Sequence, residues 1–241
     1  MSTVASHPHK HRPAARIIVA IDGPAGAGKS TVAGHLARRF SLLNLETGAM
    51  YRAFGLKALR AQIALEDVPA LEALAAETTI RLEPGEQGNR VLLDGEDVTG
   101  LIRAQPVTDA ASRVSVFPPI RAWMVSLQQQ MGAGGGVVME GRDIGTVVFP
   151  QAEVKIFLDA APEVRGIRRY DQLGLQPPKK PDEVIQDLRA RDERDRNRAD
   201  SPLRAAPGAI LLDSTHMTLD EVLRAAENIV TEYLDGAPAG R

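Results

Sequence analysis

Cysteine is absent from this chain of 241 residues. Its absence excludes disulfides and thiolate metal sites and fits a reducing compartment, so we expect a cytoplasmic protein. No apolar run approaches the roughly 18 residues of a membrane-spanning helix, and we expect no membrane partner. The first 16 residues lack the apolar segment of a signal peptide and are rich in histidine and basic residues. We expect a solvated, flexible tail there.

Lysine is scarce among the basic residues. Of 29 lysines and arginines, 6 are lysine and 23 are arginine, and the formal net charge is -2. The chain as a whole therefore lacks the excess positive charge typical of nucleic-acid-binding proteins, and we expect no nucleic-acid partner. Arginine suits bidentate recognition of phosphate, although a GC-rich genome would raise its count as well. The arginines therefore become informative only through their positions.

One glycine-rich stretch follows an apolar run at 17–21 and precedes a predicted helix at 30–40. It reads Gly23-Pro24-Ala25-Gly26-Ala27-Gly28-Lys29-Ser30-Thr31. This order is typical of a loop that binds the phosphates of ATP, because glycines let backbone N–H groups converge on phosphate oxygens beside a helix N-terminus. Lys29 can reach the outer phosphates and the Ser30 hydroxyl can ligate Mg²⁺. The structural alternative is a turn that merely joins strand and helix.

Apolar strands alternate with amphipathic helices along most of the chain, which predicts an α/β fold with a doubly wound, five-stranded parallel sheet as its core. The strands are expected at 17–22, 42–46, 137–140, 154–158 and 209–213. This core is expected to take in 17–61, 103–170 and 199–235, with tails at 1–16 and 236–241.

Two segments interrupt the alternation. Residues 62–102 hold a predicted helix at 67–77 and a hairpin of 79–83 with 90–94, which makes a small antiparallel insert. Residues 171–198 are predicted to form a short lid region, because a loop with three prolines at 174–181 precedes a helix.

Several charged residues lie where α/β proteins bind ligands, just after strands. Thr47 is a plausible N-cap, and Arg52 follows it one turn into a helix, where a surface ion pair is the favoured alternative. Arg142 and Asp143 directly follow the strand at 137–140. Four residues of the last lid turns share one helix face, for which a solvated surface with ion pairs such as Arg191 to Asp195 is the alternative. They are Arg191, Arg194, Asp195 and Arg198.

Three classes of protein compete for a triphosphate-binding loop. A switch GTPase needs an Asn/Thr-Lys-x-Asp motif at a strand end, and Lys179-Lys180-Pro181-Asp182 lacks its first residue. A motor or chaperone ATPase needs an apolar strand ending in an acidic pair, which 137–140 matches only in part. A small-molecule kinase needs a second anion site and mobile arginines, which the sequence offers. We therefore favour a kinase.

Four ordered blocks resemble the bacterial cytidylate kinases across residues 16–234. They are the loop at 23–31, Thr47-Gly48-Ala49-Met50-Tyr51-Arg52, the stretch from Glu140-Gly141-Arg142-Asp143 to Pro150, and Arg191-Asp192-Glu193-Arg194-Asp195-Arg196-Asn197-Arg198. The resemblance implies a monomer that transfers the γ-phosphoryl group of ATP, with Mg²⁺, to CMP or dCMP. It also implies that the insert at 62–102 binds the monophosphate. A related kinase of another monophosphate or small metabolite remains the alternative.

The resemblance implies roles for the matching positions. Those that contact the donor nucleotide are Gly23, Pro24, Ala25, Gly26, Ala27, Gly28, Lys29, Ser30, Thr31 and Arg168, which lies with Arg165 and Arg169 where such kinases place donor-side arginines. Those that read cytosine are Thr47, Arg121 and Asp143. The acceptor-phosphate clamp is Arg52, Arg142 and Arg198, and the ribose contacts are Ser112, Arg191 and Asp195. The catalytic residues are Lys29, Arg142, Arg191 and Arg198, and Ser30 is the metal ligand.

The chemistry of the base agrees with these roles, because a carboxylate can accept from cytosine N4 and an arginine can donate to N3 or O2. Uracil would place a carbonyl opposite the Asp143 carboxylate, and two acceptors repel each other. In two places the chain departs from the family, since Glu46 and Glu140 stand where an aspartate is usual.

Overall fold

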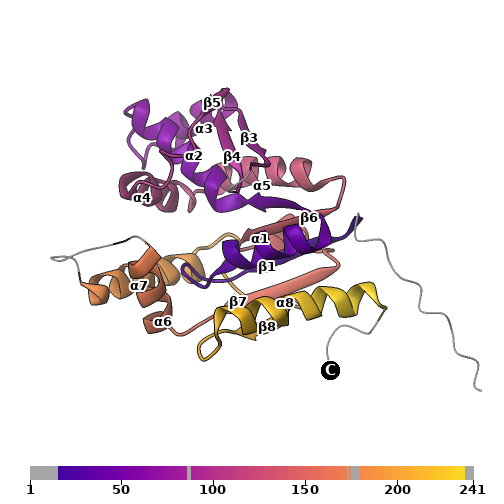
Figure 1. Cartoon of the computed structure of the whole chain (residues 1–241). Coiled ribbons are helices and arrows are strands. Elements are labelled where there is room, and N and C mark those ends of the chain that lie inside the picture. The colour runs from indigo at the N-terminus through magenta and orange to yellow at the C-terminus, as the bar shows by residue number, and fades with distance from the viewer. Residues whose placement is uncertain (1–15, 86–87, 173, 175–179, 237–241) are drawn as a thin grey trace, which may run out of the picture.

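The computed structural model describes residues 16–85, 88–172, 174 and 180–236. Nearly all of the predicted tails, and residues 175–179 of the predicted lid loop, lie outside these ranges. Five parallel strands form one sheet in the order β2-β6-β1-β7-β8 (Figure 1). They are β1 (Ile18–Asp22), β2 (Leu43–Glu46), β6 (Val137–Gly141), β7 (Val154–Asp159) and β8 (Ile210–Asp213). The predicted sheet is confirmed.

Apolar side chains lie on both faces of the sheet, and each face is covered by other elements. On one face, α1 (Lys29–Phe40) and α8 (Leu219–Leu234) pack against β1, β7 and β8 in a single apolar cluster. On the other, the short π-helical turn η2 (Ile144–Val148) packs against side chains of β1, β2 and β6. The C-terminal ends of β1 and β6 lie side by side, with Asp22 paired in register with Gly141. The phosphate loop and the Arg142-Asp143 pair therefore leave the same edge of the sheet.

A second apolar cluster lies beside the sheet. It joins α2 (Thr47–Arg60), α4 (Gln105–Val114) and α5 (Pro118–Gly132) to the predicted insert. The insert holds α3 (Val68–Ala76) and a three-stranded antiparallel sheet of β3 (Ile80–Glu83), β4 (Arg90–Leu93) and β5 (Glu96–Asp97). The hairpin was expected, whereas its third strand was not.

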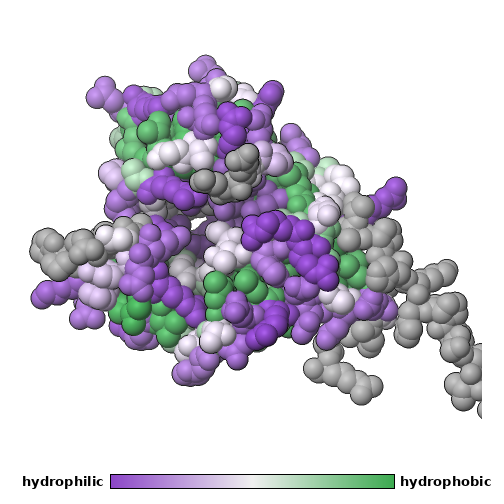
Figure 2. All heavy atoms as spheres, viewed as in Figure 1, coloured by the Kyte–Doolittle hydropathy of each residue, from purple (hydrophilic) through white to green (hydrophobic). Residues whose placement is uncertain are grey.

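Helices α6 (Pro162–Gln172) and α7 (Pro181–Asn197) pack against each other at the C-terminal edge of the parallel sheet. A Cβ on Gly166 would meet Ile185 Cγ1 at 2.2 Å, so only glycine permits this approach. In Figure 2 the surface is hollowed between these two helices and the part of the molecule that holds α2, α4 and the insert. Hydrophilic residues surround the hollow. Among the described residues, no helix is long and apolar enough to span a membrane.

Candidate active site

The glycine-rich loop joins β1 to α1 in the geometry that phosphate binding requires. Gly28 has φ +97°, and a Cβ on Gly23, at φ +150°, would meet Leu158 O at 1.9 Å. Helix α1 starts without a side-chain cap and without an acidic residue in its first turn. Its N-terminal N–H groups and its partial positive charge therefore face the loop without competition from an acidic residue of the helix itself.

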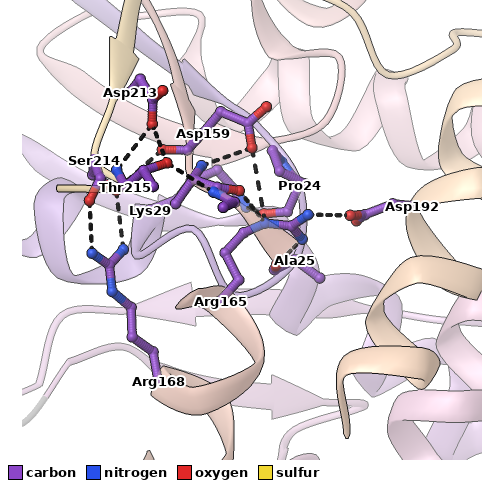
Figure 3. A network of polar contacts seen from close by, with 12 residues as sticks. Pro24, Ala25, Lys29, Asp159, Arg165, Arg168, Asp192, Asp213, Ser214 and Thr215 are labelled. Carbon is purple, nitrogen blue, oxygen red and sulfur yellow. Dashed lines mark hydrogen bonds and ion pairs between the residues drawn. The ribbon is translucent and has the colours of Figure 1, made fainter. Parts of the chain in front are cut away.

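Lys29 is buried at the base of this loop. Its Nζ donates to Pro24 O at 2.7 Å, and 5 % of the side chain is exposed (Figure 3). Burial, with the nearby charge of Arg142, lowers the pKa of Lys29 to about 7 although Glu140 opposes the change. A buried ammonium with this pKa is held in a site that favours an added anion.

Ser30 and Glu140 bring two hard oxygen donors together. The Ser30 hydroxyl donates to Glu140 Oε1 at 2.5 Å, and the carboxylate ends β6 beside the loop. Hydroxyl and carboxylate oxygens are ligands that Mg²⁺ accepts when phosphates and waters complete its shell. No cluster of three or more metal-ligating side chains is present among the described residues. The pair fits a Mg²⁺ ion that arrives with a nucleotide.

Asp143 and Arg121 form a buried ion pair beyond the end of β6. They are 7 % and 4 % exposed, and Arg121 Nη1 also donates to Ser115 O at 3.1 Å. Arg198 Nη2 lies 3.8 Å from the other Asp143 oxygen. A carboxylate and a guanidinium with fixed positions can read the donor and acceptor pattern of one base edge.

Helix α7 meets the sheet through charged side chains. Arg142 Nε donates to Asp195 at 2.9 Å, and Arg194 Nη2 donates to the Ser112 hydroxyl at 3.5 Å. Burial alone would raise the pKa of Asp195, but Arg142 and Arg191 hold that pKa below its usual value. The alternative of a solvated helix with an Arg191–Asp195 pair is therefore wrong for this face, because Asp195 is buried and bonds Arg142 across the site.

Four cations lie close to one another in the site. Burial and the neighbouring Arg142 lower the pKa of Arg191 to about 10, and Arg52 contributes to the same field. The Nε atoms of Arg52 and Arg191 are buried and have no hydrogen-bond partner. Together with Lys29, these arginines form the cation cluster (Lys29, Arg52, Arg142, Arg191). Unpartnered buried donors with positive charge favour binding of a polyanion.

Two predictions at α2 need correction. Thr47 is not the N-cap, because the helix starts at Thr47 itself and its hydroxyl donates to Glu140 O at 2.7 Å. Arg52 is not a surface ion pair, since its Nε is buried and its pKa is lowered by burial. Both residues are therefore tied to the edge of the sheet where the phosphate loop begins.

Arg168 lies away from the cation cluster. It donates to the Ser214 hydroxyl at 3.0 Å and to Ser214 O at 2.9 Å, on the loop that follows β8 (Figure 3). The hydroxyl in turn donates to Asp159 O at 3.1 Å. Arg168 is thus held against the loop that follows β8.

Sequence reasoning missed three residues that shape the site. Asp22 accepts from the N–H groups of Ile144 at 2.8 Å and Gly145 at 2.7 Å, and burial raises its pKa to about 6. Glu140 was noted only as a departure from the family. Arg165 was grouped with the donor-side arginines, yet it is 1 % exposed. An acid that ends a buried strand just before the loop was the available signal for Asp22.

Comparison with known proteins places this site in a family. A profile of cytidylate kinase matches residues 19–232. The chain is 49 % identical to a cytidylate kinase of Solibacter usitatus, over 89 % of this chain and 92 % of that one. It is 43 % identical to the one of Pasteurella multocida (91 % and 97 %) and 47 % identical to the one of Syntrophotalea carbinolica (90 % and 93 %).

Among solved structures, the chain is similar to a shikimate kinase from Bacteroides thetaiotaomicron, with a TM-score of 0.48 and 14 % identity over 91 % of this chain and 98 % of that one. This likeness is too distant to add to the assignment. The sequence matches span nearly the whole described fold and contain the loop, the strand-end pair and the α7 arginines. The chain belongs to the cytidylate kinase family.

Proposed function

We propose that this protein transfers the γ-phosphoryl group of ATP to CMP or dCMP, giving CDP or dCDP and ADP. Family membership supports the reaction, and relatives at 43 % to 49 % identity are named cytidylate kinases. The observation that carries the acceptor's identity is the buried Arg121–Asp143 pair, which lies next to the arginines of α7 and β6. A base reader beside a phosphate clamp is what a nucleoside monophosphate requires.

The donor half of the site is the glycine-rich loop with Arg168 at its border. The loop's N–H groups and Lys29 would hold the phosphates of ATP, and Ser30 with Glu140 would hold Mg²⁺. A bound Mg²⁺ would neutralise charge that develops between the β- and γ-phosphates. Arg168 would border the adenosine, consistent with its place against the loop after β8.

The acceptor half is built from three groups of residues. Arg52, Arg142 and Arg198 would clamp the monophosphate. Thr47, Arg121 and Asp143 would read the base, and Ser112, Arg191 and Asp195 would contact the ribose. The support for this assignment is the burial of its five other members beside the arginines, together with the hydrogen bonds that Arg142 makes to Asp195 and Arg194 makes to Ser112. The five are Thr47, Ser112, Arg121, Asp143 and Asp195.

Base selection follows from the fixed pair. Asp143 would accept from cytosine N4 and Arg121 would donate to N3 or O2. Uracil would set a carbonyl against the Asp143 carboxylate, where two acceptors repel. Binding would replace the direct Arg121–Asp143 bond by bonds to the base, so that neither buried charge is left without a partner.

The reaction needs no general base. The acceptor phosphate has a second pKa near 6 and is largely dianionic at neutral pH. Lys29, Arg142, Arg191 and Arg198 would stabilise the charge of the transferring group, and closure of the predicted lid at 171–198 would exclude water. Asp143 therefore orients the base and removes no proton.

A coupled assay of ADP release across CMP, dCMP, UMP, AMP and GMP tests the proposal. CMP or dCMP should be the best acceptor. Faster turnover of UMP or AMP would indicate a related kinase of another monophosphate. Tight binding of a guanine nucleotide without phosphoryl transfer would indicate an NTP-driven switch instead.

We further propose that the protein is a cytoplasmic monomer and that its insert at 62–102 binds the monophosphate. Light scattering after size-exclusion chromatography tests the monomeric state. Fractionation of cells that express the full chain tests the location.

A further inference from the structure

Arg165 on α6 is a fully buried arginine that touches no part of the acceptor site. Its Nε donates to Ala160 O at 2.7 Å and its Nη1 donates to Ala25 O at 2.8 Å (Figure 3). Its Nη2 lies 2.6 Å from Asp192 Oδ2 on α7. One side chain thus contacts the phosphate loop, the turn after β7 and the helix that carries the α7 arginines.

Asp192 is buried together with its partner. It is 5 % exposed, and its Oδ1 has no hydrogen-bond partner. A buried ion pair is a poor source of net stability, because desolvation of both charges offsets their attraction. We therefore look to what the Arg165–Asp192 pair positions, and not to what it adds to stability.

The bond from Arg165 to Ala25 orients the phosphate loop. Because the peptide group is planar and trans, a carbonyl directed at Arg165 sends the following N–H, that of Gly26, in the opposite direction. Gly26 itself is packed against Arg165, since a Cβ there would meet Arg165 Cβ at 3.2 Å. Arg165 therefore restrains the loop segment that would bind the donor phosphates.

The bond from Arg165 to Asp192 orients α7. The same face of the helix packs Val184 and Leu188 against Ala25 of the loop. One helical turn further on, Asp195 is paired with Arg142 at the end of β6. Helix α7 is thus held by one ion pair on the donor side and by another on the acceptor side. Arg191 directly precedes Asp192, so both ion pairs fix its position.

We propose that Arg165 and Asp192 are a positioning pair, which sets α7 in register with the phosphate loop so that Arg191 meets the transferring phosphate. The inference rests on the proposed kinase function. Neither residue contacts a substrate; both act through Ala25 and Arg191. Binding of ATP at the loop would be transmitted to α7 through the same two bonds, before CMP arrives.

Steady-state kinetics and thermal unfolding of matched variants test the pair. Asp192→Asn keeps the shape and should lower kcat about tenfold, and Arg165→Met should lower it by up to about 10²-fold, as misplacement away from the chemistry can do. The double variant Arg165→Met with Asp192→Leu removes both buried charges and should regain thermal stability. Its kcat should stay low, because the bond to Ala25 is gone.

The matched control is Glu163→Gln. Glu163 pairs with Arg189 across the same two helices, but both side chains are more than half exposed. This variant should match the wild type in kcat and in thermal midpoint. If the double variant regains kcat together with its thermal midpoint, or if Asp192→Asn leaves kcat unchanged, the pair is only structural and the proposal is wrong.

Hydrogen exchange separates this inference from the proposed reaction. Addition of ATP and Mg²⁺ alone should slow exchange of the α7 backbone amides in the wild type and much less in Asp192→Asn. Equal protection in both proteins would overturn the positioning pair. Failure of the wild type to phosphorylate CMP would overturn the proposed function and leave the exchange test to decide the pair.

Discussion

Lys29 should take up a proton when ATP binds. In the free protein its pKa is lowered to about 7, first by burial and then by Arg142. The phosphates of ATP bring several negative charges to the same place, which favours the ammonium form. Binding should therefore shift Lys29 from partly neutral to fully charged.

The magnitude follows from the titration curve. With a pKa of about 7, about 0.1 of Lys29 is neutral at pH 6 and about 0.9 at pH 8. Proton uptake per ATP bound should rise between these values. Protonation of Lys29 costs about 1.4 kcal/mol at pH 8 and more at higher pH, so affinity for ATP should fall roughly fifteenfold from pH 7 to pH 8.5.

Isothermal titration calorimetry of ATP with Mg²⁺, in buffers that differ in ionisation enthalpy, measures the uptake. The matched control is Lys29→Arg, which keeps a positive charge at every pH of the experiment and should show no such uptake. Uptake near zero at pH 8 in the wild type, or equal uptake in Lys29→Arg, would refute the reasoning.

Three further predictions concern the strand ends. Arg142→Ala should leave the circular dichroism spectrum intact and reduce kcat by about 10²-fold or more, since it would remove a donor of the proposed phosphate clamp; a near-normal rate would remove Arg142 from the acceptor site. Glu140→Gln should raise the Mg²⁺ concentration needed for half-maximal rate about tenfold, because a charged ligand becomes neutral; an unchanged Mg²⁺ dependence would exclude Glu140 from that site. Burial raises the pKa of Asp22 in the folded state to about 6, from 3.8 for an aspartate in water. The folded state therefore binds more protons in this window, and the Asp22 contribution to the free energy of unfolding falls by about 2 kcal/mol as pH rises from 4 to 7. Denaturant unfolding gives the free energy of unfolding of the wild type and of Asp22→Asn at each pH. The difference between the two should decline as pH rises, and a constant difference would contradict the prediction.

The parallel sheet could be predicted because its strands are short continuous apolar runs, each followed by an amphipathic helix. The glycine-rich loop could be predicted because its φ angles demand glycine at fixed spacing. The edge strand β5 could not, since it is two exposed acidic residues, Glu96 and Asp97, whose pairing depends on β4. Periodicity carries no signal for a strand of that length.

The roles of individual charged residues were harder to predict. An arginine in a charge-rich helix is ordinarily solvated, and nothing in the local sequence of Arg165 distinguishes it from Arg169. Its burial arises from α7 and the phosphate loop, which are distant in sequence. Thr47 has the residue type of an N-cap, but the carbonyl of Glu140 on a neighbouring strand competes for its hydroxyl. Tertiary contacts decided both cases.

The central claim is that Asp143, fixed by Arg121, selects cytosine for phosphorylation. The most direct measurement is kcat/KM for CMP and for UMP, in the wild type and in Asp143→Asn. The wild type should prefer CMP at least about tenfold, and the variant should lose CMP activity and bring the ratio towards unity, because an amide can donate to the uracil carbonyl. A wild type that uses UMP as well as CMP, or an unchanged preference in Asp143→Asn, would contradict the account.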